Sequence, residues 1–126
     1  MPKRILVPLD QTAEAERIVP VVVGTARGCG ASVRLLHVAP DRRFDAEARD
    51  YLAVVELAFD GVPVEIVVRY GTPAEEVLYE ANEFGADLIA VTTGSGTPRN
   101  ATPLGRVAEA LLRRAAVPVL LLRPER

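Results

Sequence analysis

Glycine and hydroxyl side chains crowd into residues 91–109, VTTGSGTPRNATPLGRVAE, between an apolar run and a helical pattern. A glycine-rich loop that leads from a strand into a helix often holds a phosphate, because backbone N–H groups and the positive end of the helix dipole face the anion. Arg99 and Arg106 add positive charge to this segment. The segment matches neither the P-loop pattern GxxxxGK[ST] nor a GxGxxG after the first strand. On composition alone, Gly94 and Gly96 fit a phosphate cradle or a simple tight turn.

Asp10 is the second residue whose position suits ligand chemistry. It follows the apolar run RILVPL, and its carboxylate could accept a hydrogen bond from a sugar hydroxyl. A structural role, in which Asp10 caps the first helix or its loop, stays open on the same residues. His37, inside RLLHVAP, and Cys29, which has no CxxC partner, fit structural roles. The sequence shows neither a nucleophile–base pair nor a metal-ligand cluster.

Short apolar runs alternate with helical patterns along the chain, and several runs are nearly continuous in Val, Ile and Leu. The predicted strands cover residues 4–9, 32–38, 62–68, 87–91 and 117–122. The predicted helices cover residues 12–28, 42–59, 72–84 and 102–115. Continuous apolar runs suit strands buried on both faces, and strict alternation with helices gives a parallel sheet. The sequence therefore predicts one α/β domain over residues 1–126, a doubly wound five-stranded parallel sheet with four helices on both faces.

The third predicted helix carries clear boundary signals. Thr72 can cap it, Pro73 fits its first position, and Glu75 completes a capping box with Thr72. Gly85 ends the helix. The apolar stripe that we expect to face the core comprises Val77, Leu78, Ala81 and Phe84.

The fourth predicted helix opens in the same way, with Thr102 as cap and Pro103 at the first position. Its expected inward side comprises Leu104, Val107, Ala108, Leu111, Leu112 and Ala115. The first helix contains Pro20, which should kink it or delay its start.

Composition and charge exclude several classes of protein. With 126 residues, 49% hydrophobic and 25% charged, the chain is an ordinary globular domain. No apolar run approaches the roughly 18 residues of a membrane span, and a single cysteine is typical of the reducing cytoplasm. The net charge is only −2, with the positive charge concentrated after residue 90. This pattern favours a small anionic ligand near residues 91–109 over nucleic acid.

In an open parallel sheet, ligands bind beyond the carboxyl ends of the strands, where the winding direction reverses. Asp10 and the loop at 91–109 both follow predicted strands. If the first and fourth strands are neighbours, the two features face each other across one crevice.

RILVPLDQTAEAERIVP resembles the first-strand signature of the universal stress protein family, with a basic residue, an apolar run containing proline, and Asp before a hydroxyl residue. SVRLLHVAP, VVRYGTPAEEVLYEANEFGADLIAV and LGRVAEALLRRAAVPVLLLRP are similar to later strands and helices of that family. The resemblance covers nearly the whole chain. It implies the strand order 3-2-1-4-5, which makes the first and fourth strands neighbours.

The resemblance also implies a cytoplasmic binding and signalling module that holds ATP or a related adenine nucleotide, with or without Mg²⁺, between strands one and four. Asp10 would face ribose or adenine, the Val38 backbone would face the base, and the loop glycines would line the phosphates. Any ATP hydrolysis would be slow. The implied nucleotide-binding residues are Pro8, Asp10, Val38, Gly94, Gly96, Gly105, Arg106 and Val107.

The loop departs from the pattern of the ATP-binding members, which reads Gly, two residues, Gly, nine residues, Gly, then Ser or Thr. Thr97 stands where a second glycine would follow Gly94, and eight residues separate Gly96 from Gly105. Arg106 replaces the final hydroxyl residue. Two readings of Arg106 are open: its side chain fills the phosphate position and excludes ATP, or it grips a phosphate.

The implied strand order puts the last strand at a sheet edge, where unpaired backbone groups tend to associate. We expect a homodimer through residues 117–122, Val117–Leu122, unless a helix covers this strand. The alternative function is a family member that binds no nucleotide and acts through dimer or partner contacts. An adenylating enzyme of related fold is disfavoured, because it needs Ser-Gly-Gly where this chain has Asp10-Gln11-Thr12.

Overall fold

The computed structural model describes residues 1–93 and 103–123. Five strands form one parallel sheet in the order β3-β2-β1-β4-β5. The strands are β1 (Arg4–Pro8), β2 (Ser32–Ala39), β3 (Val64–Tyr70), β4 (Leu88–Thr92) and β5 (Val119–Leu122). The helices are α1 (Ile18–Cys29), α2 (Asp45–Glu56), α3 (Pro73–Phe84) and α4 (Pro103–Arg114), with short 3-10 turns η1 (Ala15–Arg17) and η2 (Arg42–Phe44). The predicted fold and strand order are confirmed.

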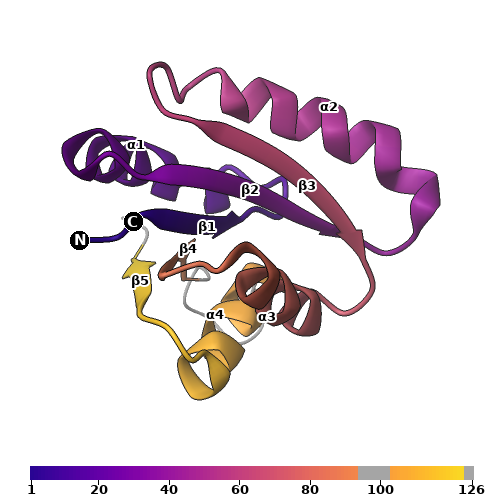
Figure 1. Cartoon of the computed structure of the whole chain (residues 1–126). Helices are drawn as coiled ribbons and strands as arrows, with labels where there is room; N and C mark the ends of the chain where they lie inside the picture. Colours follow the sequence, from indigo (N-terminus) through magenta and orange to yellow (C-terminus); the bar gives the residue numbers. More distant parts are fainter. Residues whose placement is uncertain (94–102, 124–126) are drawn as a thin grey trace.

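The helices divide between the two faces of the sheet. Helices α1 and α2 cover one face, and α3 and α4 cover the other (Figure 1). The apolar side chains of the central strands are therefore closed off from solvent on both sides. In β1, for example, Ile5, Leu6 and Val7 are fully buried, which explains why the run is continuous rather than alternating.

Strand order places the change of winding direction between β1 and β4. The chain moves from β1 through β2 to β3 on one side, then crosses to β4 and continues to β5 on the other. Residues Ile5 and Leu6 pair with Leu88 and Ile89 across this junction. The junction is the place where a ligand site is expected in such a sheet.

Pro20 delays the first helix, as predicted. The segment before it forms η1, and α1 begins only at Ile18, so that Pro20 stands in the first turn. A proline costs little there, because the first N–H groups of a helix have no intrahelical partner.

The predicted capping box of α3 is wrong. Thr72 is the N-cap residue with an extended backbone, but its side chain makes no capping hydrogen bond. Glu75 instead forms an ion pair with Arg114, whose Nη2 lies 3.2 Å from Glu75 Oε1. A cationic partner on the neighbouring helix draws the carboxylate away from its own helix end. Pro73 at the first position and the left-handed Gly85 at the end are confirmed.

The inward side of α4 is partly as predicted. Val107, Ala108 and Leu111 are buried, but Leu112 is 61% exposed. Each residue turns about 100° around the helix, which carries Leu112 beyond the side that Val107, Ala108 and Leu111 share. Thr102 lies outside the described residues.

Candidate functional site

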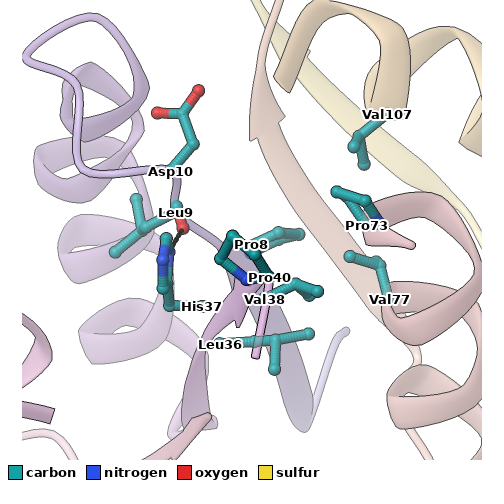
Figure 2. A pocket seen from close by; sticks show the side chains of 10 residues that line it. All are labelled: Pro8, Leu9, Asp10, Leu36, His37, Val38, Pro40, Pro73, Val77 and Val107. Carbon is teal, nitrogen blue, oxygen red and sulfur yellow. Dashed lines mark hydrogen bonds between the residues drawn. The ribbon is translucent and has the colours of Figure 1, made fainter. Parts of the chain in front are cut away.

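A pocket of about 250 Å³ opens at the carboxyl ends of β1 and β2. Figure 2 shows Pro8 and Val38 on one side of it and Pro73, Val77 and Val107 on the other. Its lining residues are Pro8, Leu9, Asp10, Leu36, His37, Val38, Pro40, Pro73, Val77 and Val107. Asp10 and His37 are the two residues of this set with polar side chains. An apolar cavity with a few polar groups is the usual form of a small-molecule site.

The end of β1 shapes one wall of the pocket. The strand stops at Pro8, and the next residue, Leu9, still donates its N–H to Leu36 O at 2.8 Å. Beyond that bond the chain leaves the sheet, and Asp10 is the first residue of the departing loop. The carboxyl ends of β1 and β2 thus stay side by side up to the pocket.

Asp10 holds the loop that follows β1. Its Oδ1 accepts hydrogen bonds from Thr12 N at 3.1 Å and from Thr12 Oγ1 at 2.6 Å. The structural role of Asp10 that the sequence left open is therefore real. Asp10 Oδ2, however, is buried and has no hydrogen-bond partner among the described residues.

Asp10 Oδ2 indicates which kind of ligand suits this pocket. Buried polar atoms are nearly always hydrogen-bonded, and leaving one unpaired is costly. A carboxylate accepts hydrogen bonds, so a partner of Oδ2 beyond the described residues would be a donor, such as a ligand hydroxyl or amino group. Adenine and ribose offer flat apolar faces together with such donors, which fits the residues present.

His37 is fixed by contacts on both ring nitrogens. Its Nδ1 donates to Leu9 O at 2.7 Å, and Gln11 Nε2 lies 3.4 Å from its Nε2. The ring of Tyr51 packs edge-on at a centroid distance of 6.3 Å. These contacts agree with the packing role predicted for His37. Sequence reasoning missed that the same side chain also lines the pocket.

Tyr51 stays a hydrogen-bond donor behind His37. Its hydroxyl donates to Glu16 Oε2 at 2.8 Å. Burial raises the pKa of Tyr51 far above its ordinary value, and the hydrogen bond to the Glu16 carboxylate raises it further. This bond links α2 to η1, the segment that follows the loop of Asp10.

Helix α3 is held against the sheet by a buried carboxylate. Glu80 is 4% exposed, and its two oxygens accept hydrogen bonds from Arg34 of β2 at 2.6 Å and Arg69 of β3 at 3.2 Å. Because α3 supplies Pro73 and Val77 to the pocket, these ion pairs fix the position of its second wall.

The structure brings four of the predicted binding residues together: Pro8, Asp10, Val38 and Val107 all line the pocket. Arg106 is exposed and lines a separate depression with Glu109 and Arg113 on the outer side of α4. Gly105 lies in the first turn of α4. Gly94 and Gly96 lie outside the described residues.

Sequence reasoning missed several lining residues besides His37. These are Leu9, Leu36, Pro40, Pro73 and Val77. Pro40 follows β2 and Pro73 begins α3, so both stand at element boundaries that the sequence does indicate. Boundary residues at the carboxyl edge of a predicted parallel sheet are the signal that could have found them.

Among the described residues, no cluster of three or more His, Cys, Asp or Glu side chains could hold a metal ion. None of the described helices is long and apolar enough to cross a membrane.

Comparison with known proteins places the chain in a family. The model of the universal stress protein family matches residues 1–123. Universal stress protein G of Shigella flexneri is 36% identical over 101 residues, which is 74% of this chain and 70% of that protein.

Two solved structures share the fold. A universal stress protein in complex with cAMP has a TM-score of 0.78 at 21% identity over 98% of each chain. The universal stress protein from Archaeoglobus fulgidus in complex with dAMP has a TM-score of 0.76 at 22% identity, over 94% of this chain and 96% of that one. Together with the family match over residues 1–123, these likenesses lead to one conclusion: the chain belongs to the universal stress protein family.

Proposed function

We propose that this protein is a cytoplasmic signalling module that binds an adenine nucleotide in the pocket between the ends of β1, β2 and the start of α4. The observation that carries the proposal is Asp10 Oδ2, a buried acceptor without a described partner at an otherwise apolar pocket. Related structures with cAMP and with dAMP support the choice of an adenine nucleotide.

The lining residues suggest how the ligand is oriented. The apolar side chains of Pro8 and Val38 suit the faces of the base, and Asp10 suits a ribose hydroxyl. A phosphate would be repelled by the Asp10 carboxylate and attracted by the N-terminal end of α4. We therefore expect the phosphates to point from Asp10 toward α4.

Titration calorimetry with AMP, cAMP and ATP, with and without Mg²⁺, tests this function. We expect saturable binding that weakens about tenfold in Asp10→Asn, because the lost charge removes a charge-assisted hydrogen bond. Glu109→Gln is the matched control, since Glu109 is exposed on the outer side of α4, and it should bind like the wild type. No heat and no thermal shift at millimolar adenine nucleotide would overturn the proposal. Mass spectrometry of ligand released from the purified protein would identify the nucleotide.

Arg106→Ser separates the two readings of Arg106. If the arginine blocks the phosphate position, ATP should bind more tightly to the variant while AMP changes little. If it grips a phosphate, ATP binding should weaken and become less sensitive to salt.

A second candidate function, without nucleotide, rests on the edge strand β5. This strand pairs with β4 and ends the sheet, and its residues Val119–Leu122 are all apolar and only partly buried. Pairing with a second copy would cover these side chains and the free backbone groups. Light scattering at micromolar concentration should give the mass of a dimer, and a monomer would contradict this candidate.

A further inference from the structure

Thr12 stands in the middle of a short hydrogen-bond chain beside the pocket. Ala15 N donates to Thr12 Oγ1 at 3.1 Å, and Thr12 Oγ1 donates to Asp10 Oδ1 at 2.6 Å. A hydroxyl has one proton, and the amide of Ala15 already fills an acceptor position on this oxygen. The proton of Thr12 is therefore directed at Asp10. The backbone N–H of Thr12 gives the same carboxylate oxygen a second donor, at 3.1 Å.

The backbone at Gln11 makes this geometry possible. Its φ of 68° makes it the one non-glycine residue with a positive φ in the described part of the chain. Side chains other than glycine and asparagine rarely adopt this conformation, and strained residues of this kind cluster at functional sites. The turn at Gln11 brings the amide and hydroxyl of Thr12 back to the carboxylate that precedes them.

The two oxygens of Asp10 are therefore unequal. Oδ1 has two donors from Thr12, whereas Oδ2 is buried with no described partner. The bonds to Oδ1 also restrict rotation of the carboxylate, so Oδ2 keeps a fixed direction.

We propose that Thr12 is the positioning residue of this pocket: by occupying Oδ1 it leaves Asp10 Oδ2 as a single oriented acceptor that selects a ligand hydroxyl. This inference rests on the proposed nucleotide function and deepens it. It says that Asp10 selects ligands by a hydroxyl on their sugar rather than by their phosphates. A ligand hydroxyl can donate to Oδ2, whereas a phosphate oxygen at the same point would face a like charge. Thr12 itself need not touch the ligand.

The test compares AMP with 2′,3′-dideoxy-AMP in three proteins, by calorimetry. Thr12→Val keeps the shape of the side chain but removes the hydroxyl, and we expect AMP to bind about five- to tenfold more weakly. Binding of the dideoxy compound should change less than twofold, because it has no sugar hydroxyl for Asp10 to orient. Thr12→Ser restores the hydroxyl and should bind AMP within about twofold of the wild type.

The Asp10→Asn background supplies a further check. If Thr12 acts through Asp10, adding Thr12→Val to Asp10→Asn should weaken AMP binding far less than it does alone. Thermal unfolding without ligand confirms that each variant is folded, and Thr12→Ala replaces Thr12→Val if the latter is not.

Distinct outcomes overturn distinct claims. Wild-type protein that binds no AMP overturns the proposed function, and the role of Thr12 with it. Wild-type binding combined with an unchanged Thr12→Val affinity, or with equal losses for AMP and its dideoxy form, overturns the role of Thr12 alone.

Discussion

Two regions of this protein hold carboxylate oxygens away from solvent. They differ in whether these oxygens have hydrogen-bond partners among the described residues. On the face of the sheet that α3 covers, each oxygen of Glu80 accepts a hydrogen bond, one from Arg34 and one from Arg69. At the end of β1, Asp10 has one oxygen bonded by Thr12 and one without a described partner. Both oxygens of Glu80 thus have partners, although Arg34 Nε is buried without one among the described residues, whereas at Asp10 it is a carboxylate oxygen, Oδ2, that has no described partner.

The charges around Glu80 compensate one another. Burial by itself would lower the pKa of Arg34, but hydrogen bonds to Glu65 and Glu80 outweigh it and raise that pKa. The guanidinium also lies over the ring of Phe84, at 4.2 Å from its centroid. A buried charge with this many partners stabilises the packing of α3. Asp10 Oδ2, which has no described partner, is the atom to which we propose that a ligand donates.

The largest effect is expected from Glu80→Ala. Removing the buried carboxylate leaves Arg34 and Arg69 with only their more exposed partners, Glu65 and Glu76. We expect this to cost about 3 kcal/mol of the free energy of unfolding. Glu65→Ala is the control, because Glu65 pairs with the same Arg34 but is 65% exposed, and it should cost less than about 1 kcal/mol. Urea unfolding measures both, and equal losses would contradict a special role for the buried pair.

Asp10→Asn should change nucleotide affinity more than the free energy of unfolding. The amide keeps an acceptor for Thr12 and replaces the unpaired anionic oxygen, so the free energy of unfolding should change by less than about 1 kcal/mol. Nucleotide affinity should nevertheless fall about tenfold, or ~1.4 kcal/mol. Urea unfolding and calorimetry on the same preparation measure the two quantities. A large loss of stability would mean that Asp10 is mainly structural.

The smallest effect concerns a third carboxylate, Asp87, at the amino ends of β1 and β4. It accepts hydrogen bonds from the backbone N–H groups of Lys3 and Arg4, at 2.9 to 3.0 Å. Burial alone would raise the pKa of Asp87, but these bonds outweigh it and lower that pKa below its ordinary value.

A lowered pKa in the folded state fixes the sign of the pH dependence. The stabilisation from Asp87 should be complete above the unfolded value of about 3.9 and disappear as the pH falls through the lower folded value. Thermal unfolding at pH 6 and pH 3 should therefore show a smaller acid-induced drop in Asp87→Asn than in the wild type. Because Asp87 is exposed, the difference should be modest. An identical drop in both proteins would show that Asp87 contributes nothing.

Most of the fold could be predicted from the sequence, because apolar runs and capping residues act locally. Pro73 and Gly85 mark the ends of α3 correctly, and Pro20 delays α1 as expected. The capping box failed because Glu75 found a stronger partner in Arg114, 39 residues away. A local pattern carries no information about such a contact.

The candidate site was predictable in part for the same reason. Asp10 could be located because it follows a predicted strand, and Val38 because of the resemblance to the universal stress protein family. His37 and Val77 could not be assigned to the pocket, since whether they line it depends on strand register and on how α3 packs against the sheet.

By itself the sequence determined the elements, the fold class and the place of Asp10 at the end of a strand, since apolar periodicity and chain order are local properties. Only the tertiary structure decided which side chains share the pocket and which oxygen of Asp10 remains without a described partner. The physical reason is that burial and hydrogen bonding depend on residues distant in sequence. A strand end on its own suggests a ligand site, whereas the packed neighbours show which polar atom there has no described partner.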